Sequence, residues 1–215
     1  MRRLVAMLVG VTLVVGAPCA ATAQSAFGFK AGVNRTGLTG ADAGSPTARN
    51  RFVGGVFFGS AVSDHLALQV ELLYSRMGVG NFVNPADTSG APVNLSMSYV
   101  QLPILLRAGF PTQSVLFSVY VGPVLSYRNN CQIESAGGAT AACRAAGTPQ
   151  GFFPRATDVD AAAGAGIDFA LGESTFFIDA RYTVGLLSIE AGTDGMDTKH
   201  AVTSLMAGLA FPLGR

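Results

Sequence analysis

The sequence predicts an all-β protein, an eight-stranded antiparallel up-and-down transmembrane β-barrel. The chain is 49% apolar and only 13% charged, yet beyond its first 15 residues it has no apolar run long enough for a membrane helix. Several segments alternate apolar and polar residues with a period of two, which is the pattern of strands. The connections between these segments alternate between short and long. A barrel explains this combination because it turns its apolar side chains outward to lipid.

The N-terminus has the order of a secretory signal peptide. A positive end (Met1-Arg2-Arg3) precedes the apolar stretch Leu4 to Val15 and the small-x-small site Ala21-Thr22-Ala23. Cys19 follows Pro18, whereas a lipoprotein site has a small residue there. We therefore expect residues 1–23 to be a cleavable signal peptide and residues 24–215 to form the barrel domain.

The charge balance and length of the mature chain limit its class. Removing Arg2 and Arg3 from the 14 basic residues leaves 12 against 13 acidic residues, a net charge of −1. This balance gives no basic surface for a nucleic acid, so we expect no nucleic-acid partner. About 190 residues suit one all-β domain.

Two segments show the strand pattern most clearly. From Leu66, apolar residues alternate with polar ones up to Tyr74, and from Val100 the same alternation continues to Ala108. Six further segments follow the pattern: 26–37, 51–62, 115–127, 159–171, 175–188 and 201–213. Their lengths suit tilted membrane strands of about 9–11 residues.

Short and long connections between the predicted strands alternate strictly along the chain. The short ones are 63–65, 111–114 and 172–174, and the long ones are 38–50, 79–94, 128–158 and 190–200. An eight-stranded barrel with both termini in the periplasm has three short turns on one side and four long loops on the other. A soluble β-sandwich has no reason to sort its loops in this way.

Three motifs carry a resemblance to a known family. They are Gln69-Val70-Glu71-Leu72, then Leu102-Pro103-Ile104-Leu105-Leu106-Arg107, and then Asp179-Ala180-Arg181-Tyr182 with Gly185. In order and spacing they resemble the outer-membrane β-barrel domain family, often called porin-like, of small eight-stranded barrels in Gram-negative bacteria. The resemblance implies a location in the cell outer membrane.

The C-terminus departs from the pattern of such barrels. They usually end in an aromatic residue that the barrel-insertion machinery recognises, whereas Phe211 is followed here by four more residues. We expect Leu209 and Phe211 to supply this signal. The expected partners are outer-membrane lipid and the insertion machinery, and the expected state is a monomer.

Six charged residues fall on the face of the strands opposite the lipid: Lys30, Glu71, Arg107, Asp168, Asp179 and Arg181. Buried charges must pair because desolvation otherwise costs too much. Three cations and three anions allow a neutral interior polar network. We expect this network to plug the barrel, because eight strands leave room for little more than side chains. The alternative is a narrow polar pathway.

Cys131 and Cys143 lie in the longest predicted loop. The exported compartment is oxidising, so we expect them to form a disulfide. A metal site formed by this pair of cysteines is a poor alternative, because two thiolates are too few ligands and no histidine lies nearby in the sequence.

An enzyme is a further alternative, since some small outer-membrane barrels act on lipids or peptides at their outer rim. His200 directly precedes the last predicted strand, with Ser188, Glu190 and Asp197 near it in the sequence, and these could form a Ser-His-acid group. The other histidine, His65, falls in a short turn and is expected to be solvated. Residues this common in loops do not define a triad, so no catalytic residue is predicted.

The predicted function is therefore a structural or interaction scaffold with surface loops and a plugged polar interior. A narrow pore for small solutes is the alternative, and a rim enzyme is the third choice. We expect no cofactor and no metal, because the loop at 192–197 lacks the spacing and the terminal glutamate of a calcium loop.

Overall fold

The computed structural model describes residues 25–39, 47–82, 92–135, 137–143, 156–186 and 199–213. Within these ranges no helix is long and apolar enough to cross a membrane. The strands are β1 (Ser25–Thr39), β2 (Thr47–Ala61), β3 (Leu66–Phe82), β4 (Val93–Pro111), β5 (Val115–Ser135), β6 (Thr140–Ala142), β7 (Thr157–Leu171), β8 (Ser174–Gly185) and β9 (Lys199–Leu213).

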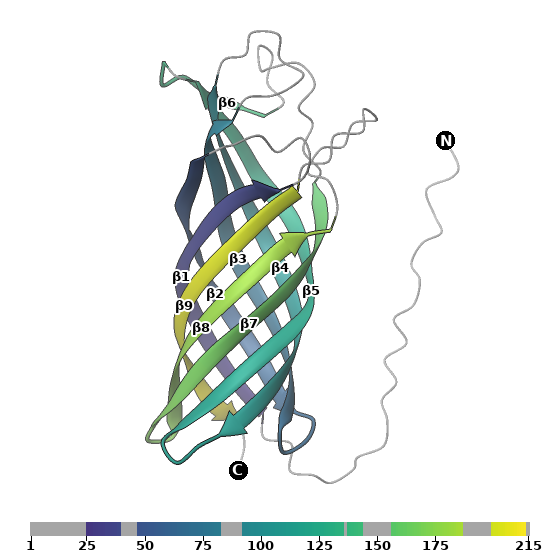
Figure 1. The fold of residues 1–215 in the computed structure, drawn as a ribbon, viewed down its shortest axis with the longest axis vertical. Coiled ribbons are helices and arrows are strands. Elements are labelled where there is room, and N and C mark those ends of the chain that lie inside the picture. Colours follow the sequence, from purple (N-terminus) through teal and green to yellow (C-terminus); the bar gives the residue numbers. More distant parts are fainter. Residues whose placement is uncertain are drawn as a thin grey trace, which may run out of the picture.

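Eight of these strands close into a barrel (Figure 1). Neighbouring strands pair antiparallel, and β1 pairs with β9 from Ser25 opposite Leu213 to Thr39 opposite Lys199. The ring is completed by the pairings β4–β5 and β5–β7. The short strand β6 pairs only with residues 132–134 of β5, above the ring. The predicted eight-stranded antiparallel barrel is confirmed.

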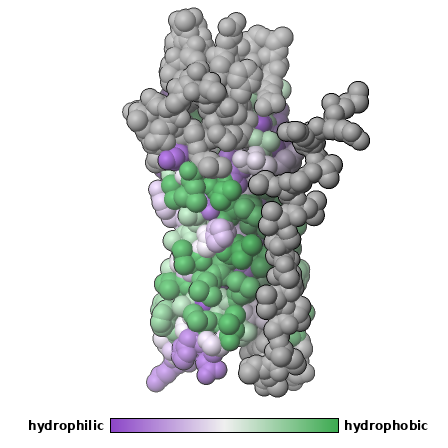
Figure 2. Space-filling model, turned by 90° about the vertical axis from the view of Figure 1, so that its right-hand side faces the viewer, coloured by the Kyte–Doolittle hydropathy of each residue, from purple (hydrophilic) through white to green (hydrophobic). Residues whose placement is uncertain are grey.

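The outer surface of the barrel is apolar, as the alternation predicts. On β3 the outward-facing Leu68 and Leu72 are 44% and 52% exposed. Leu73, the next residue along the strand, points inward and is only 2% exposed. Figure 2 shows a hydrophobic band around the visible face, with hydrophilic residues above and below it. This band is the surface that meets lipid.

The upper edge of the apolar band is a row of outward-facing residues on three strands. Tyr74 of β3 lies opposite Val100 of β4, and Val100 lies opposite Tyr127 of β5. One step farther out the paired residues are Arg76 and Ser98. Tyrosines at this level are typical of the membrane interface, so the strands leave the apolar layer here.

Beyond this row, β3, β4, β5 and β6 continue as an outer extension, formed by residues 76–82, 93–98, 128–135 and 140–142. Its inward side is apolar and buried, with the cluster Met77, Val79, Leu95, Met97, Tyr99, Cys131, Ile133, Cys143 and Val202. Its outward side bears polar residues such as Ser96 and Gln132. The polarity of the outward face therefore inverts where the strands leave the lipid.

Three predicted loops are shorter in the structure. The predicted loop 38–50 shrinks because β1 runs to Thr39 and β2 begins at Thr47, and the outer extension occupies part of two others. The regions 79–94 and 128–158 were expected to be loops, but β3 runs to Phe82, β4 begins at Val93 and β5 runs to Ser135. β6 is an additional strand that the sequence analysis did not predict. The sequences of these stretches resemble those of loops because their outward residues are polar, although their inward residues pack in a core. The three short turns stand where they were predicted.

Candidate functional site

A network of buried charges crosses the interior of the barrel between β1, β3 and β8. Lys30, Glu71, Asp179 and Arg181 are each no more than 5% exposed. Lys30 Nζ donates to Glu71 Oε1 at 2.7 Å and to Asp179 Oδ2 at 3.1 Å. Arg181 binds both carboxylate oxygens of Glu71, at 2.9 and 2.8 Å. Each of these four charges thus has at least one opposite charge in contact.

Tyr120 of β5 closes this network on its other side. Its hydroxyl donates to Asp179 Oδ1 and accepts from Arg181 Nε at 3.3 Å. The guanidinium carbon of Arg181 lies 5.2 Å from the centre of the Tyr120 ring. Gly164 of β7 lies opposite both Tyr120 and Arg181, and its missing side chain leaves room for the Tyr120 ring.

Gln69 connects a second ion pair to the same network. Gln69 Nε2 donates to Glu71 Oε1 at 2.6 Å, and Gln69 Oε1 accepts from Arg107 Nη1 at 3.3 Å. Arg107 Nη2 in turn lies 2.7 Å from Asp168 Oδ1. The side chains of this second pair are 13% and 15% exposed, so it is wetter than the first group.

The structure thus brings all six charged residues that the sequence analysis placed inside into one connected network. Three cations face three carboxylates, and the sum of their formal charges is zero. Such pairing offsets the desolvation of each group, which is otherwise several kcal/mol for a buried ion. The network links six of the eight barrel strands, since it draws on β1, β3, β4, β5, β7 and β8.

Two phenylalanines pack beneath Lys30. Its ammonium lies 5.6 Å from the ring centre of Phe57 and 5.8 Å from that of Phe177. The two rings meet edge to face, with their centres 5.5 Å apart. This apolar contact closes the interior around the charged group from the side of the short turns.

Two cavities lie on opposite sides of the network in the described part of the barrel. A cavity of about 430 Å³, the inner vestibule, lies at the end with the short turns and reaches Gln69, Arg107, Asp168, Phe57 and Phe177. A cavity of about 10 Å³ lies on the other side of the network, against Arg181 and Asn34. The smaller one has room for about one water molecule. The network stands between them.

A second polar cluster lies nearer the outer end. Asp160 of β7 accepts a hydrogen bond from Ser126 Oγ at 2.7 Å, and its other oxygen lies 3.1 Å from His200 Nε2. Gln101 Nε2 donates to Ser126 Oγ at 3.0 Å. Asp158, two residues away on the same strand, is only 4% exposed.

The arrangement of this cluster can be compared with the Ser-His-acid triad that the rim-enzyme alternative requires. Ser188, Glu190 and Asp197 lie outside the described residues, and His200 is 1% exposed inside the barrel. Here the carboxylate of Asp160 stands between Ser126 and His200. A Ser-His-acid triad instead needs the histidine between the serine and the acid. The described cluster therefore lacks the contact between nucleophile and base.

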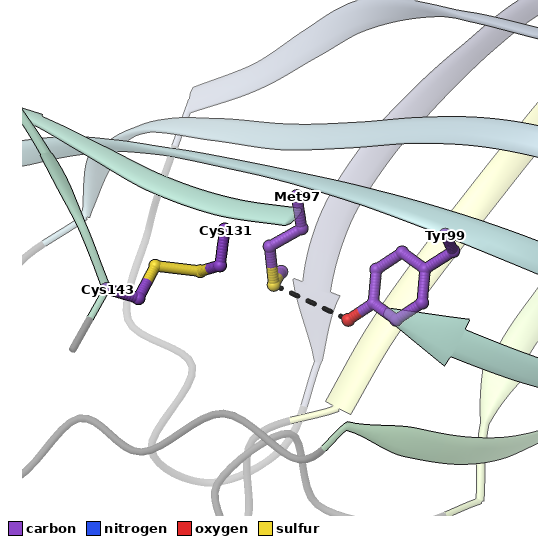
Figure 3. Close-up of a disulfide and its surroundings, with 4 residues drawn as sticks. All are labelled: Met97, Tyr99, Cys131 and Cys143. Carbon is purple, nitrogen blue, oxygen red and sulfur yellow. Dashed lines mark hydrogen bonds between the residues drawn. A yellow bond between two sulfur atoms is a disulfide. The ribbon is translucent and has the colours of Figure 1, made fainter. Parts of the chain in front are cut away.

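The predicted disulfide is present. Cys131 of β5 and Cys143, just after β6, are joined with their Cα atoms 5.5 Å apart. Figure 3 shows the disulfide with Met97 and Tyr99 nearby. The Tyr99 hydroxyl donates to the sulfur of Met97 at 3.4 Å. The bond closes the β5–β6 hairpin, and both cysteines are buried in the apolar core of the outer extension.

Metal ligation has no support among the described residues, which hold no group of three His, Cys, Asp or Glu side chains able to bind an ion. His65 is exposed in the turn between β2 and β3. The loop at 192–197, considered for calcium, lies outside the described residues.

Tyr120 and Gln69 were missed as members of the network. Both lie on the inward face by strand alternation, and a search for every inward polar group would have found them. The predicted network contained charged residues alone. The pairing of Asp160 with His200 was also missed, because it joins β7 to β9, which are not neighbours in the sheet.

Comparisons with known proteins agree with this architecture. The model of the outer membrane protein beta-barrel domain family matches residues 21–190. The chain is similar in fold to the outer membrane protein OprG from Pseudomonas aeruginosa, with a TM-score of 0.52 and 14% identity over 90% of this chain and 98% of that one. No curated protein sequence matches the chain.

Two further solved structures are similar at lower TM-scores. Neisserial surface protein A (NspA) has a TM-score of 0.47 and 18% identity over 87% of this chain and 99% of that one. The outer membrane enzyme PagL has a TM-score of 0.46 and 13% identity over 86% and 99%.

Proposed function

Because the chain belongs to the outer membrane protein beta-barrel domain family, we propose that it is an outer-membrane scaffold with a closed interior. In this role the barrel anchors the protein in lipid, and the part of the chain beyond the membrane makes the contacts. The inner network has a structural role and conducts nothing.

The observation that carries the proposal is the neutral network across the interior. Lys30, Glu71, Asp179 and Arg181 are fully paired and buried, and they separate the inner vestibule from the small cavity above. An ion entering this layer would have to break contacts of 2.7–2.9 Å between desolvated charges. Removing one partner of such a pair costs about 3–5 kcal/mol, which supports a closed state.

The outer extension supports the scaffold role from the other end. Its apolar core packs β3, β4 and β5 against one another beyond the lipid-facing band, and its disulfide ties the end of β6 to β5. A rigid platform of this kind reduces the ordering cost of binding a partner. We infer that the outer extension is the part of the barrel that presents the contact surface.

Conductance in planar bilayers tests the proposal. The protein purified from outer membranes, checked as a heat-modifiable barrel, is expected to insert without channel steps. Arg181→Ala with Tyr120→Ala removes two network side chains and is expected to open the interior and give steps, which shows that the assay detects insertion. Steps from the wild-type protein that change with Arg107→Ala or Glu71→Ala would overturn the closed scaffold.

The inner vestibule favours a second candidate, the narrow pore. Arg107 and Asp168 are partly exposed where they line it, so solutes from that side can reach the network. In a pore, rearrangement of this pair would have to open the layer above it. The same bilayer recording separates the two functions, because the scaffold predicts silence at every voltage.

We also infer that residues 1–23 are removed on export. The support is the order of positive end, apolar stretch and small-x-small site. Edman sequencing of the membrane-purified protein is expected to find Gln24 as its first residue. A chain that begins at Met1, or a lipid-modified Cys19, would contradict the inference.

A further inference from the structure

The inner vestibule has the size of a small-molecule site. Its volume of about 430 Å³ lies within the range of about 300–1,000 Å³ that is typical of ligand pockets. Asp64, His65 and Glu173 line it from two of the short turns, and Phe57 and Phe177 line its deep end, against the network. A ligand that enters from the side of the turns would therefore stop at the two rings.

The wall of the vestibule is mostly apolar. Ala26, Ala67 and Ala210 bring only methyl groups to it from β1, β3 and β9, which keeps the space open, and Leu116 adds a larger apolar side chain from β5. Transfer of an apolar molecule from water to such a wall is favourable. The vestibule therefore suits a ligand with an apolar body.

One ion pair of the network is accessible from this space. The side chains of Arg107 and Asp168 are 13% and 15% exposed, and both line the vestibule. Arg107 donates to Asp168 Oδ1 at 2.7 Å and to Gln69 Oε1 at 3.3 Å, so its guanidinium group is held by two partners. An ionised carboxylate offers about four acceptor positions. Asp168 can therefore accept a further hydrogen bond from a donor in the vestibule.

Negative charge dominates the lining of the vestibule. Among the described residues that form it, Asp64, Asp168 and Glu173 contribute three carboxylates, against the single guanidinium of Arg107. With His65 neutral, the formal charge of this lining is −2. A cleft lined by one sign of charge concentrates ligands of the opposite sign. The lining therefore favours a cation over an anion.

We propose that the inner vestibule binds a small organic cation, a primary amine with an apolar body. The ammonium group donates to Asp168, and the body lies against the apolar wall and the rings of Phe57 and Phe177. The short turns of such barrels face the periplasm, so the amine enters from that compartment. The site is independent of the closed-scaffold proposal, because the vestibule can be filled while the network above it stays closed.

Fluorescence titration with tryptamine tests the proposal. Tryptamine joins an indole ring to a primary ammonium group, and its emission can be followed because the protein contains no tryptophan. We expect saturable binding to the membrane-purified protein in detergent, after the signal of empty micelles is subtracted. Tryptophol has a hydroxyl group in place of the amine. It is expected to bind at least about tenfold more weakly, because it lacks the charge-assisted hydrogen bond to Asp168.

Two variants locate the site. Ala67 lines the vestibule and alternates with the inward-facing Gln69, so Ala67→Phe places a ring in this space and is expected to abolish saturable binding. Asp168→Asn removes the carboxylate and is expected to weaken tryptamine binding at least about tenfold while leaving the weak binding of tryptophol unchanged. The matched control is Glu134→Gln on β5, in the outer extension, which should leave the binding of both molecules unchanged.

Three results would overturn the proposal. Equal affinity of the wild type for tryptamine and tryptophol would mean that the charge is not recognised. Equal binding of tryptamine by the wild type and Ala67→Phe would place the ligand elsewhere, and stronger binding of the anion indole-3-propionate than of tryptamine would indicate an anion site at Arg107. The first comparison uses the wild type alone, so it decides the question even if Asp168→Asn fails to fold.

Discussion

Arg181 binds both carboxylate oxygens of Glu71, with Nη1 2.9 Å from Oε2 and Nη2 2.8 Å from Oε1. The two residues belong to β8 and β3, which are not neighbours in the sheet. Their contact therefore crosses the interior and ties opposite walls of the barrel together. Loss of this contact should therefore destabilise the whole barrel.

Arg181→Met is expected to lower the free energy of unfolding by about 3–5 kcal/mol, because Lys30 is then the one cation left for the two carboxylates Glu71 and Asp179. Urea titration in lipid vesicles measures this. Arg35→Met, an exposed arginine on β1, is the matched control and should change the value by no more than about 0.5 kcal/mol. An unchanged midpoint for Arg181→Met would mean that the interior is wet.

Ile104→Arg tests the assignment of the lipid-facing side. Ile104 lies opposite Val70 on the outward face of β4, so a charge there is expected to cost about 2–4 kcal/mol. Val100→Arg, at the level of the tyrosine row, should cost only about 0–1 kcal/mol. The same vesicle titration compares them, and equal costs at both depths would contradict the placement of the apolar band.

Gly164→Ala should destabilise the barrel by about 1–3 kcal/mol through overpacking. A methyl group at Gly164 would overlap the Tyr120 ring and the backbone oxygen of Ala180. Ala165→Val adds carbon atoms at the next position, on the exposed side of β7, and serves as the control. If the two variants unfold at the same urea concentration, the packing around Tyr120 is looser than the structure indicates.

Cys131→Ala/Cys143→Ala is expected to loosen the outer extension and leave the barrel intact. Opening a loop of this size costs about 3 kcal/mol in the chain-entropy model, and the bond holds only the β5–β6 hairpin. Hydrogen exchange should speed up at residues 132–134 and 140–142 and stay unchanged in β8. Faster exchange throughout β8 would show that the disulfide supports the whole barrel.

Alternation along the strands made much of the fold predictable. A period of two fixes which face a residue occupies, so the sequence predicted that Glu71 and Arg181 point inward while Leu72 points outward. It could not predict that Glu71 and Arg181 touch each other. That contact depends on the stagger between strands around the closed barrel, which no single strand encodes.

The outer extension was less predictable for a different physical reason. Within the lipid, an outward residue must be apolar, and this requirement produces the strong sequence signal. Beyond Tyr74 and Tyr127 the outward face meets water, so Ser96 and Gln132 can replace apolar residues without cost. The signal that remains is the buried alternation of Leu95, Met97 and Tyr99.

The spacing of the network residues has a consequence for the evolution of this barrel. Gln69 and Glu71 stand two residues apart on β3, as do Asp179 and Arg181 on β8. Deleting one residue inside either strand would turn the charges toward lipid and the apolar side chains inward. Homologous barrels should therefore gain or lose single residues in their connecting segments, and should change the length of these strands only in steps of two.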